Sequence, residues 1–495
     1  MEGKMSISKF KPDTSTQSLI IGYNIDDFIS TDHITRLIDE IVEELDTRKI
    51  EDKYSWQGQK SYSPKSLIKI IFYGYTIGVL SSRKIRNGCK QDLGFIYLAR
   101  LYRPDFRTIS DFRKNNIEEL GEYFVAILKY CNELGLLKLG KIVIDGSKFR
   151  ANASVKRSKD LKKYEEWEKK LQKEIALLNA ESEKIDKEEN ERLSDPKTDG
   201  SEILKKIRKK GELINKIKEA KEKVKKVEEE YAAKKIKRKA KINLTDEDAN
   251  IQKESGGIKK PGYNGQIAVN EDQIIIAAEL TKTQEDSKEL IPMIEAVEIN
   301  TGEKVEEVKA DSGYGNCANY EDLEERKIDG YVPDSGFKKL EEAKENGTLK
   351  PYDKNNFQYD EKNDKYVCPQ GKDLEFIKEV KHDNREDVKI YKCKSCNECE
   401  ARKICANDKN RIIERMINES CRDRMRDKLR SDEGKKKYKE RSGLVEPPFG
   451  HMKMNIKFRQ FLLRGLTKVR GEFKLICIGF NLMKIYNLKL AKVKM

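Results

Sequence analysis

Two apolar segments that each end at an aspartate constrain the fold of this 495-residue chain most strongly. KIVIDGSKFR spans residues 141–150, and VEEVKADSGYGN spans residues 305–316. Short apolar runs that stop at an acid and a turn are typical of buried strands. A buried carboxylate is costly unless a cation or hydrogen bonds compensate for its lost hydration. Asp145 and Asp311 are therefore the first candidates for a functional site.

The pattern around these strands predicts a mixed α/β sheet with helices packed on it. Residues 263–280, YNGQIAVNEDQIIIAAEL, favour a β-hairpin with apolar strands and a polar turn. Residues 287–302 favour a helix that stops at Gly302. GYVP at 330–333 favours one more short strand. Strands that alternate with helices indicate one sheet covered by helices.

Residues 156–241 differ abruptly from the sheet pattern. Two long, charged stretches with apolar residues near heptad spacing flank the breaker SDPKTDGS at 194–201. This predicts an antiparallel helical hairpin inserted into the sheet domain. One interpretation is a solvated insertion without activity, and the alternative is a functional arm.

Residues 1–140 favour a bundle of helices. Helical spacing is clear over 30–46, 63–85 and 108–136. The chain carries a net charge of +15, which favours an anionic partner such as nucleic acid. Basic residues lie along and between these helices: Lys84, Arg86, Arg100, Arg103, Arg107, Arg113 and Lys114. We expect a DNA-binding domain here, and the alternative is a plain helical domain with solvated charges.

Residues 336–430 carry six of the ten cysteines, and five of them are candidate metal ligands. These are Cys368, Cys393, Cys396, Cys399 and Cys405. CxxC spacing lets one turn present two thiolates to a tetrahedral Zn²⁺. We expect a structural zinc site formed by Cys368 and three of the other four. The alternative is reduced cysteines in a domain that folds without metal.

Residues 431–495 predict two amphipathic helices, and Glu446 lies in the first, just before Pro447-Pro448. Mg²⁺ or Mn²⁺ prefers carboxylate oxygens, and two such ions promote in-line phosphoryl transfer. Glu446 is the natural third carboxylate beside Asp145 and Asp311. Further residues near the two aspartates are positioned to touch phosphates: Ser147, Lys148 and Tyr314.

No segment has the length and apolarity of a membrane span or the form of a signal peptide. We therefore expect a cytoplasmic protein, without a membrane partner, whose cysteines are reduced.

Four blocks in this order resemble DDE transposases of bacterial insertion sequences. They are IVIDGSKFRANAS, GYNGQIAVNED, VKADSGYGN and YKERSGLVEPPFGHMK followed by the C-terminal helix. The branch with a Tyr-Arg-Glu-Lys pattern is the most similar, and Tyr438, Arg441, Glu446 and Lys453 match it. LTDEDAN and RTISDFR also resemble this branch, and the likeness covers roughly residues 30–150 and 242–485.

The resemblance implies an RNase H-like catalytic domain that binds two Mg²⁺ ions. Asp145 would be the acid of the first strand, Asp311 the acid after the fourth strand, and Glu446 the acid on a later helix. Arg441 and Lys453 would contact phosphates of the transposon end.

The expected domain organisation has six parts. They are a DNA-binding domain at 1–140, the start of the RNase H-like domain at 141–155, the hairpin at 156–241, the middle of that domain at 242–335, the Cys-rich insertion at 336–430, and the C-terminal helices at 431–495.

The implied function is DNA transposition. The protein would bind the terminal inverted repeats of its element, cleave at the ends and join the 3′-hydroxyl to target DNA. A homodimer would hold two ends, and such a protein would lie with the bacterial nucleoid.

Several alternatives stay open. Glu440 and Glu472 compete with Glu446 for the third acid, Asp286 is expected to cap a helix, and His451 to lie at the surface or to contact a phosphate. The chain could also be a catalytically silent DNA-binding protein, a metal-dependent nuclease without strand transfer, or a coiled-coil structural protein.

Overall fold

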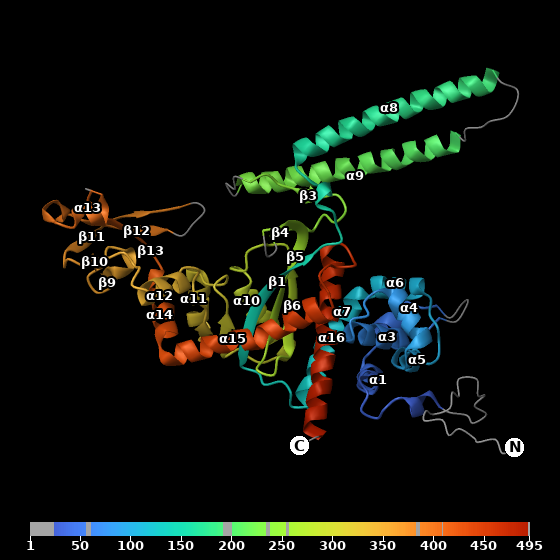
Figure 1. Ribbon diagram of the computed structural model, residues 1–495, viewed down its shortest axis with the longest axis horizontal. Helices are drawn as coiled ribbons and strands as arrows, with labels where there is room; N and C mark the ends of the chain where they lie inside the picture. The colour runs from blue at the N-terminus through green and yellow to red at the C-terminus, as the bar shows by residue number, and fades with distance from the viewer. Residues whose placement is uncertain are drawn as a thin grey trace, which may run out of the picture.

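The computed structural model of the chain describes residues 24–493, apart from 56–60, 192–199, 234–237, 254–256, 383–386 and 408. Helices, a central sheet and a second sheet follow one another along the chain (Figure 1), which confirms the mixed α/β class. The N-terminal segment 1–13 and most of the breaker at 194–201 lie outside the described residues.

The N-terminal region is helical, as predicted. Its elements are η1 (Ile25–Phe28), α1 (Ile34–Glu44), α2 (Arg48–Glu51), α3 (Pro64–Thr76), α4 (Ser82–Gln91), α5 (Leu93–Leu98), α6 (Phe106–Asn115) and α7 (Ile117–Glu133). Pro64 opens α3, where its missing N–H is not needed. Two predicted DNA contacts are engaged elsewhere. Arg113 is buried and donates to the Leu80 carbonyl, and Arg100 pairs with Asp39.

The central sheet contains six strands. They are β1 (Lys141–Arg150), β4 (Asn250–Lys253), β5 (Lys259–Val269), β6 (Ile275–Thr281), β7 (Glu307–Ala310) and β8 (Asp329–Tyr331). β5 pairs antiparallel with β1, β4 and β6, whereas β7 is parallel to both β1 and β8. The predicted hairpin is therefore β5–β6, and β1 lies between it and the strand that leads to Asp311.

Helices from both halves of the chain cover this sheet. They are α10 (Leu290–Thr301), α11 (Cys317–Glu325), α15 (Asp432–Gly450) and α16 (Leu466–Val493). α16 packs against α3, α7 and β6, so the N-terminal helices and the sheet share one continuous apolar core. α15 packs along β1, β5, β7 and β8. This packing places α15, the helix that carries Glu446, against the two strands that lead to Asp145 and Asp311.

The charged insertion forms a hairpin of two long helices, α8 (Leu161–Glu191) and α9 (Gly200–Ala233). The short strands β2 (Ser158–Lys159) and β3 (Ile242–Asn243) pair at its root. The helices bury their own apolar side chains, among them Tyr164, Ile217 and Val224, apart from the main core. The hairpin therefore extends from the sheet as a separate arm (Figure 1).

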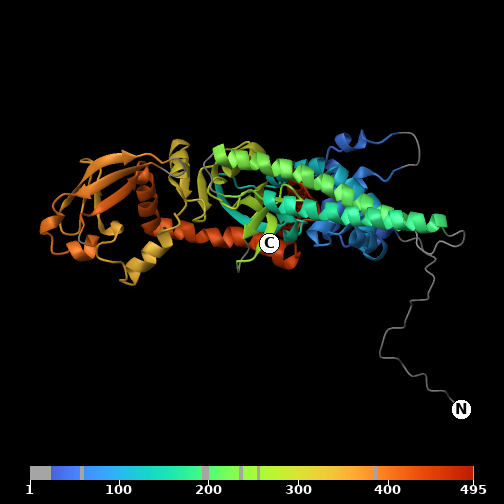
Figure 2. The same ribbon diagram turned by 90° about the horizontal axis from the view of Figure 1, so that it is seen from above.

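The cysteine-bearing region forms a five-stranded antiparallel sheet, which the sequence patterns did not predict. Its elements are α12 (Phe337–Glu345), β9 (Gln358–Asp360), β10 (Lys365–Val367), β11 (Asp373–Val380), β12 (Val388–Cys393), α13 (Arg402–Ala406), β13 (Ile412–Met416) and α14 (Glu419–Arg430). The strand order is β13-β12-β11-β10-β9. This sheet lies at one end of the molecule, opposite the N-terminal helices (Figure 2).

In the part of the chain that the structure describes, no helix is both long enough and apolar enough to cross a membrane.

Candidate active site

The two aspartates predicted from strand ends lie next to each other. β1 and β7 are parallel neighbours, and Ile144 pairs with Ala310 across them. Asp145 is the next residue of β1, in the middle of that strand, and Asp311 directly follows the end of β7, so the two aspartates lie side by side where β7 ends. The Asp311 side chain accepts a hydrogen bond from the Gly313 N–H at 2.8 Å.

Asp145 is poorly hydrated, and this changes its ionisation. The pKa of the Asp145 carboxyl is raised to about 6, chiefly by burial. The positive charge of Arg441 opposes this rise, and the negative charges of Asp311 and Asp286 contribute to it. The Gly146 N–H donates to Asp145 Oδ1 at 2.9 Å. Arg441 Nη1 lies 3.6 Å from Asp145 Oδ2, and this nitrogen is buried without a hydrogen-bond partner. The site therefore holds a carboxylate that lacks sufficient positive charge.

Asp286 supports β1 from behind, and its expected role as a helix cap is wrong. Its carboxylate accepts hydrogen bonds from Asn264 Nδ2 at 2.6 Å, Gln266 Nε2 at 2.7 Å and Lys148 Nζ at 3.2 Å. α10 instead begins after Glu289, without a side-chain cap. Paired residues of β1 and β5 share a face, so this network lies on the face of β1 opposite Asp145.

Position 146, the glycine of the IDGS motif, requires glycine for a steric reason. A Cβ atom on Gly146 would lie 2.4 Å from Gln266 Nε2 and 2.7 Å from Asp286 Oδ1. Only glycine lets the Asp286 network pack directly against the strand residue that follows Asp145. Sequence analysis missed Asn264 and Gln266, although two polar residues at alternate positions of an apolar strand were a visible signal.

Tyr314 and Lys148 are placed differently from the expected phosphate contacts. Tyr314 is fully buried, and its hydroxyl donates to Gln266 Oε1. This position leaves its side chain no exposed surface to offer a phosphate. Lys148 is paired with Asp286, as described above. Both residues stabilise the framework behind Asp145.

α15 presents the residues of the Tyr-Arg-Glu-Lys pattern along one side of the sheet. Tyr438 hydrogen-bonds Arg441, and the pKa of its hydroxyl is raised by burial. Beyond α15, the π-helical turn η5 (His451–Asn455) carries Lys453, whose ammonium group hydrogen-bonds the Ser147 hydroxyl. Arg441, Lys453 and Ser147 are thus brought together with Asp145, whose side chain shares a face of β1 with Ser147.

The two rivals of Glu446 have other partners. Glu440 accepts a hydrogen bond at 2.9 Å from Lys309, which lies on β7 two residues before Asp311. Glu472 is fully buried and accepts from the Leu462 and Leu463 N–H groups. Glu440 thus ties α15 to the sheet, and Glu472 orders the segment before α16. Glu446 is exposed on α15.

The helix around Glu446 contains two prolines, Pro447 and Pro448, and continues through them to Gly450. Pro447 has no N–H to donate to the carbonyl of Gly443, four residues earlier. Gln273 Nε2 donates to that carbonyl at 2.9 Å from the turn between β5 and β6. The carbonyl that Pro447 leaves without a helical donor therefore links this part of α15 to the β5–β6 turn. A π-helical turn follows α15. Within the described residues, no three His, Cys, Asp or Glu side chains are grouped closely enough to hold a metal ion.

The five predicted zinc ligands gather in one place. Cys368, Cys393, Cys396, Cys399 and Cys405 all line a single cavity of about 20 Å³. Burial raises the pKa of the Cys396 and Cys405 thiols. The five thiols thus line one cavity, with strands β11 and β12 between Cys368 and Cys396, but among the described residues they are not grouped closely enough to hold a metal ion.

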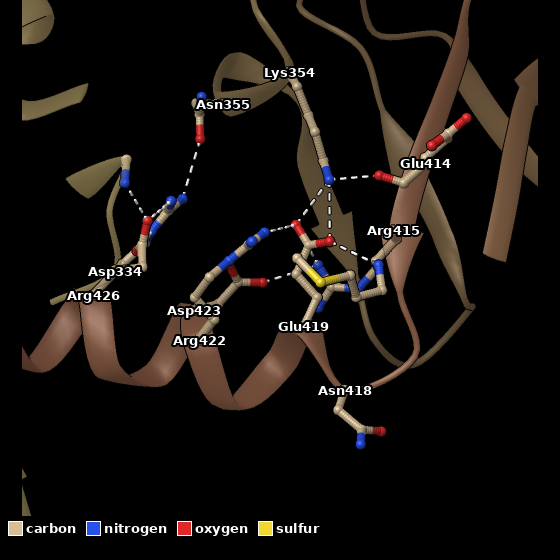
Figure 3. Close-up of polar contacts among 12 residues, drawn as sticks. Asp334, Lys354, Asn355, Glu414, Arg415, Asn418, Glu419, Arg422, Asp423 and Arg426 are labelled. Atoms are coloured by element: carbon tan, nitrogen blue, oxygen red, sulfur yellow. Dashed lines mark hydrogen bonds and ion pairs between the residues drawn. The ribbon is translucent and has the colours of Figure 1, made fainter. Parts of the chain in front are cut away.

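An ion-pair cluster joins the cysteine-bearing sheet to α14 (Figure 3). Glu419 is buried and pairs with Lys354 at 2.9 Å and Arg422 at 2.5 Å. Arg426 of the same helix pairs with Asp334, which lies just after β8 of the central sheet. α14 therefore connects the small sheet rigidly to the strands beside the aspartates.

Two family models match the chain. The model described as Transposase domain (DUF772) matches residues 23–115, and the model described as Transposase DDE domain matches residues 367–486. These matches confirm the resemblance to DDE transposases of insertion sequences. The DDE match begins beside Cys368 and includes Glu446, so strands β11, β12 and β13 of the cysteine-bearing sheet lie within the matched segment, whereas β9 precedes it.

Asp145 and Asp311 lie between the two transposase matches. No curated protein and no solved structure matched the chain. The roles of these aspartates in a DDE transposase therefore depend on the geometry described above.

Proposed function

We propose that the chain is a DNA transposase that cleaves the ends of its element and joins the freed 3′-hydroxyl to target DNA. The observation that carries the proposal is the pair of carboxylates, Asp145 in β1 and Asp311 directly after the parallel strand β7, side by side beneath α15. The transposase matches at both ends of the chain support it.

The central domain is RNase H-like in this proposal. If the short strand β4 is left out, the strands of this sheet occur along the chain in the order β1, β5, β6, β7 and β8, so β1 is the first strand and β7 the fourth. Asp145 then lies in the first strand, Asp311 follows the fourth, and Glu446 is on a later helix. These are the three positions that the DDE resemblance requires.

Asp145, Asp311 and Glu446 would hold two Mg²⁺ or Mn²⁺ ions. The donor types fit because carboxylate oxygens suit hard cations, and because Asp145 is half-buried beside Arg441 Nη1, a nitrogen without a hydrogen-bond partner among the described residues. When bound, such ions activate the attacking oxygen and stabilise the leaving oxygen.

The chain's own residues would hold the DNA in line with these acids. Arg441 and Lys453 supply positive charge on the face of β1 that carries Asp145. Asp286 and Tyr314 keep β1 in position from the other face. The N-terminal helices would bind the terminal inverted repeats, and a homodimer would hold two ends. We infer a cytoplasmic, nucleoid-associated protein.

The cysteine-bearing sheet would hold a structural Zn²⁺. Five thiols line one small cavity, and zinc needs four ligands. Bound zinc would cross-link the turn between β10 and β11, which carries Cys368, to the end of β12, the turn that follows it and α13. Its function would be to stabilise the small sheet and, through α14, the region around Asp334.

The test is cleavage and strand transfer on a labelled duplex that carries the element end, with Mg²⁺. Asp145→Asn, Asp311→Asn and Glu446→Gln should each abolish both steps while DNA binding persists. Glu472→Gln is the matched control for a glutamate outside the site, provided that its thermal unfolding is unchanged. Wild type that binds but never cuts would favour the silent DNA-binding protein, and cutting without joining would favour a nuclease.

A further inference from the structure

The root of the helical hairpin carries a surface on which basic residues outnumber acidic ones. One hollow of about 630 Å³ there is lined by Trp167, five basic side chains and one acid, Glu166. A second hollow, of about 320 Å³, lies between α9 and the segment before α16, and Glu212 is the one acid among its lining residues. We call the basic residues of the two hollows the root surface: Lys156, Arg157, Lys159, Lys163, Lys170, Lys209, Lys216 and Arg464.

Other basic residues of the same hairpin are paired. Lys221 pairs with Glu168 at 2.8 Å, Lys210 pairs with Glu174, and Arg208 pairs with Glu212 at 3.1 Å. Among the side chains that the structure describes, none of the eight residues of the root surface forms an ion pair. The hairpin thus neutralises part of its positive charge internally and leaves these eight residues without an acidic partner in the described part of the chain, which favours binding of a polyanion.

The root surface is continuous with the candidate active site. β1 passes from Asp145 to Arg150, a rise of about 17 Å at the spacing of an extended strand. Beyond Arg150, Asn152 donates to the Leu462 carbonyl and accepts at its own carbonyl from Arg464 Nε at 3.0 Å. The segment with Lys453 and Arg464 therefore runs from the acids to the hairpin root.

We propose that the root surface binds the backbone of the duplex DNA that runs through the active site. This inference rests on the proposed function for the identity of its substrate. One turn of B-DNA is about 34 Å long, so a duplex that is cut at Asp145 and Asp311 reaches the root within one turn. Lysine and arginine contacts to phosphates are independent of sequence, which suits a surface that holds the flank of the cut.

The experiment measures binding of a labelled, mixed-sequence linear duplex at a series of salt concentrations. The test variant is Lys156→Ala/Lys163→Ala/Lys170→Ala, three exposed lysines of the first hollow. The matched control is Lys184→Ala/Lys205→Ala/Lys206→Ala, three exposed lysines in the outer half of the hairpin. Each lost phosphate contact lowers the slope of log K against log salt by about 0.9. The root variant should therefore lose about 2 to 3 in slope, and the control should keep the wild-type slope.

Unchanged thermal unfolding and recovery of the slope by the triple Lys→Arg variant would show that charge, rather than folding, is the cause. An unchanged slope in the root variant would overturn the inference, as would an equal loss in the control. An equal loss on single-stranded DNA would overturn the duplex assignment. A protein that cuts and joins although its root variant binds normally would refute only this inference. A protein whose binding depends on the root but which never cuts would refute only the proposed function.

Discussion

The central sheet and the cysteine-bearing sheet achieve stability in different ways. Strands β5 and β6 are almost completely buried, and helices from both ends of the chain share their core. Most residues of β11 are exposed, and two of the seven buried residues in the small core are cysteines. A large apolar core offsets the cost of buried carboxylates such as Asp145. A small core depends on cross-links instead.

The largest effect should come from metal removal, because it should unfold the cysteine-bearing sheet and leave the central sheet intact. A strong chelator, or Cys396→Ser, should remove hydrogen-exchange protection from β10, β11 and β12 and leave β1 and β5 protected. The reason is that a structural metal contributes its binding energy to folding. The measurements are the zinc content per chain and hydrogen exchange by mass spectrometry. Cys89→Ala, in the N-terminal core, should change neither, and a small sheet that stays protected without metal would contradict the zinc proposal.

In the central sheet, Asp311→Asn should remove activity without removing structure. Losing one carboxylate ligand costs several kcal/mol of transition-state stabilisation, which is about a thousandfold in rate. Single-turnover cleavage and thermal unfolding should be measured on the same preparation. Cleavage within tenfold of wild type would show that Asp311 is not a ligand.

Asp145→Asn should stabilise the metal-free protein at neutral pH. The pKa of the Asp145 carboxyl is about 6 in the folded chain, against an ordinary value of 3.8. Between these values the folded state binds more protons than the unfolded state, so its stability falls as pH rises. The variant should gain up to about 3 kcal/mol above pH 6 and nothing below about pH 4. Urea unfolding with a chelator at both pH values measures this gain.

Asp360, an acid of the small sheet, should show the opposite pH dependence of stability. A hydrogen bond from Asn363 lowers the pKa of Asp360, so ionised Asp360 contributes stability that is lost as pH falls. Asp360→Asn should therefore destabilise slightly at neutral pH. If both variants shift stability in the same direction, burial is not the cause of the Asp145 effect.

The smallest effect should come from Gln273→Ala, which leaves the Gly443 carbonyl without its donor. Loss of one neutral hydrogen bond should cost about 1 kcal/mol. Because this bond attaches α15 near Glu446, cleavage should slow by more than the loss of stability explains. Gln358→Ala, on an exposed position of β9, is the control. Equal cleavage rates for both variants would mean that the anchoring of α15 does not affect the site.

Local pattern alone determined much of this protein. The apolar runs before Asp145 and Asp311 predicted two strands, although β1 continues past Asp145 to Arg150. The charged heptads predicted the two helices of the hairpin. CxxC spacing predicted the thiols between Cys393 and Cys399 that line one cavity. Each of these features depends on residues that are close in sequence, so periodicity and spacing are sufficient.

Only the tertiary structure decided the surroundings of the acids. Asp286 looked like a helix cap, but it lies behind β1 because Asn264 and Gln266 from another strand reach it. Tyr314 looked accessible, but packing buries it. Hydrogen bonds distinguish Glu440 and Glu472 from Glu446. Glu440 accepts from Lys309, more than a hundred residues away, and Glu472 accepts from Leu462 on the preceding loop. Burial and long-range hydrogen bonds depend on how distant segments pack, and no local pattern encodes them.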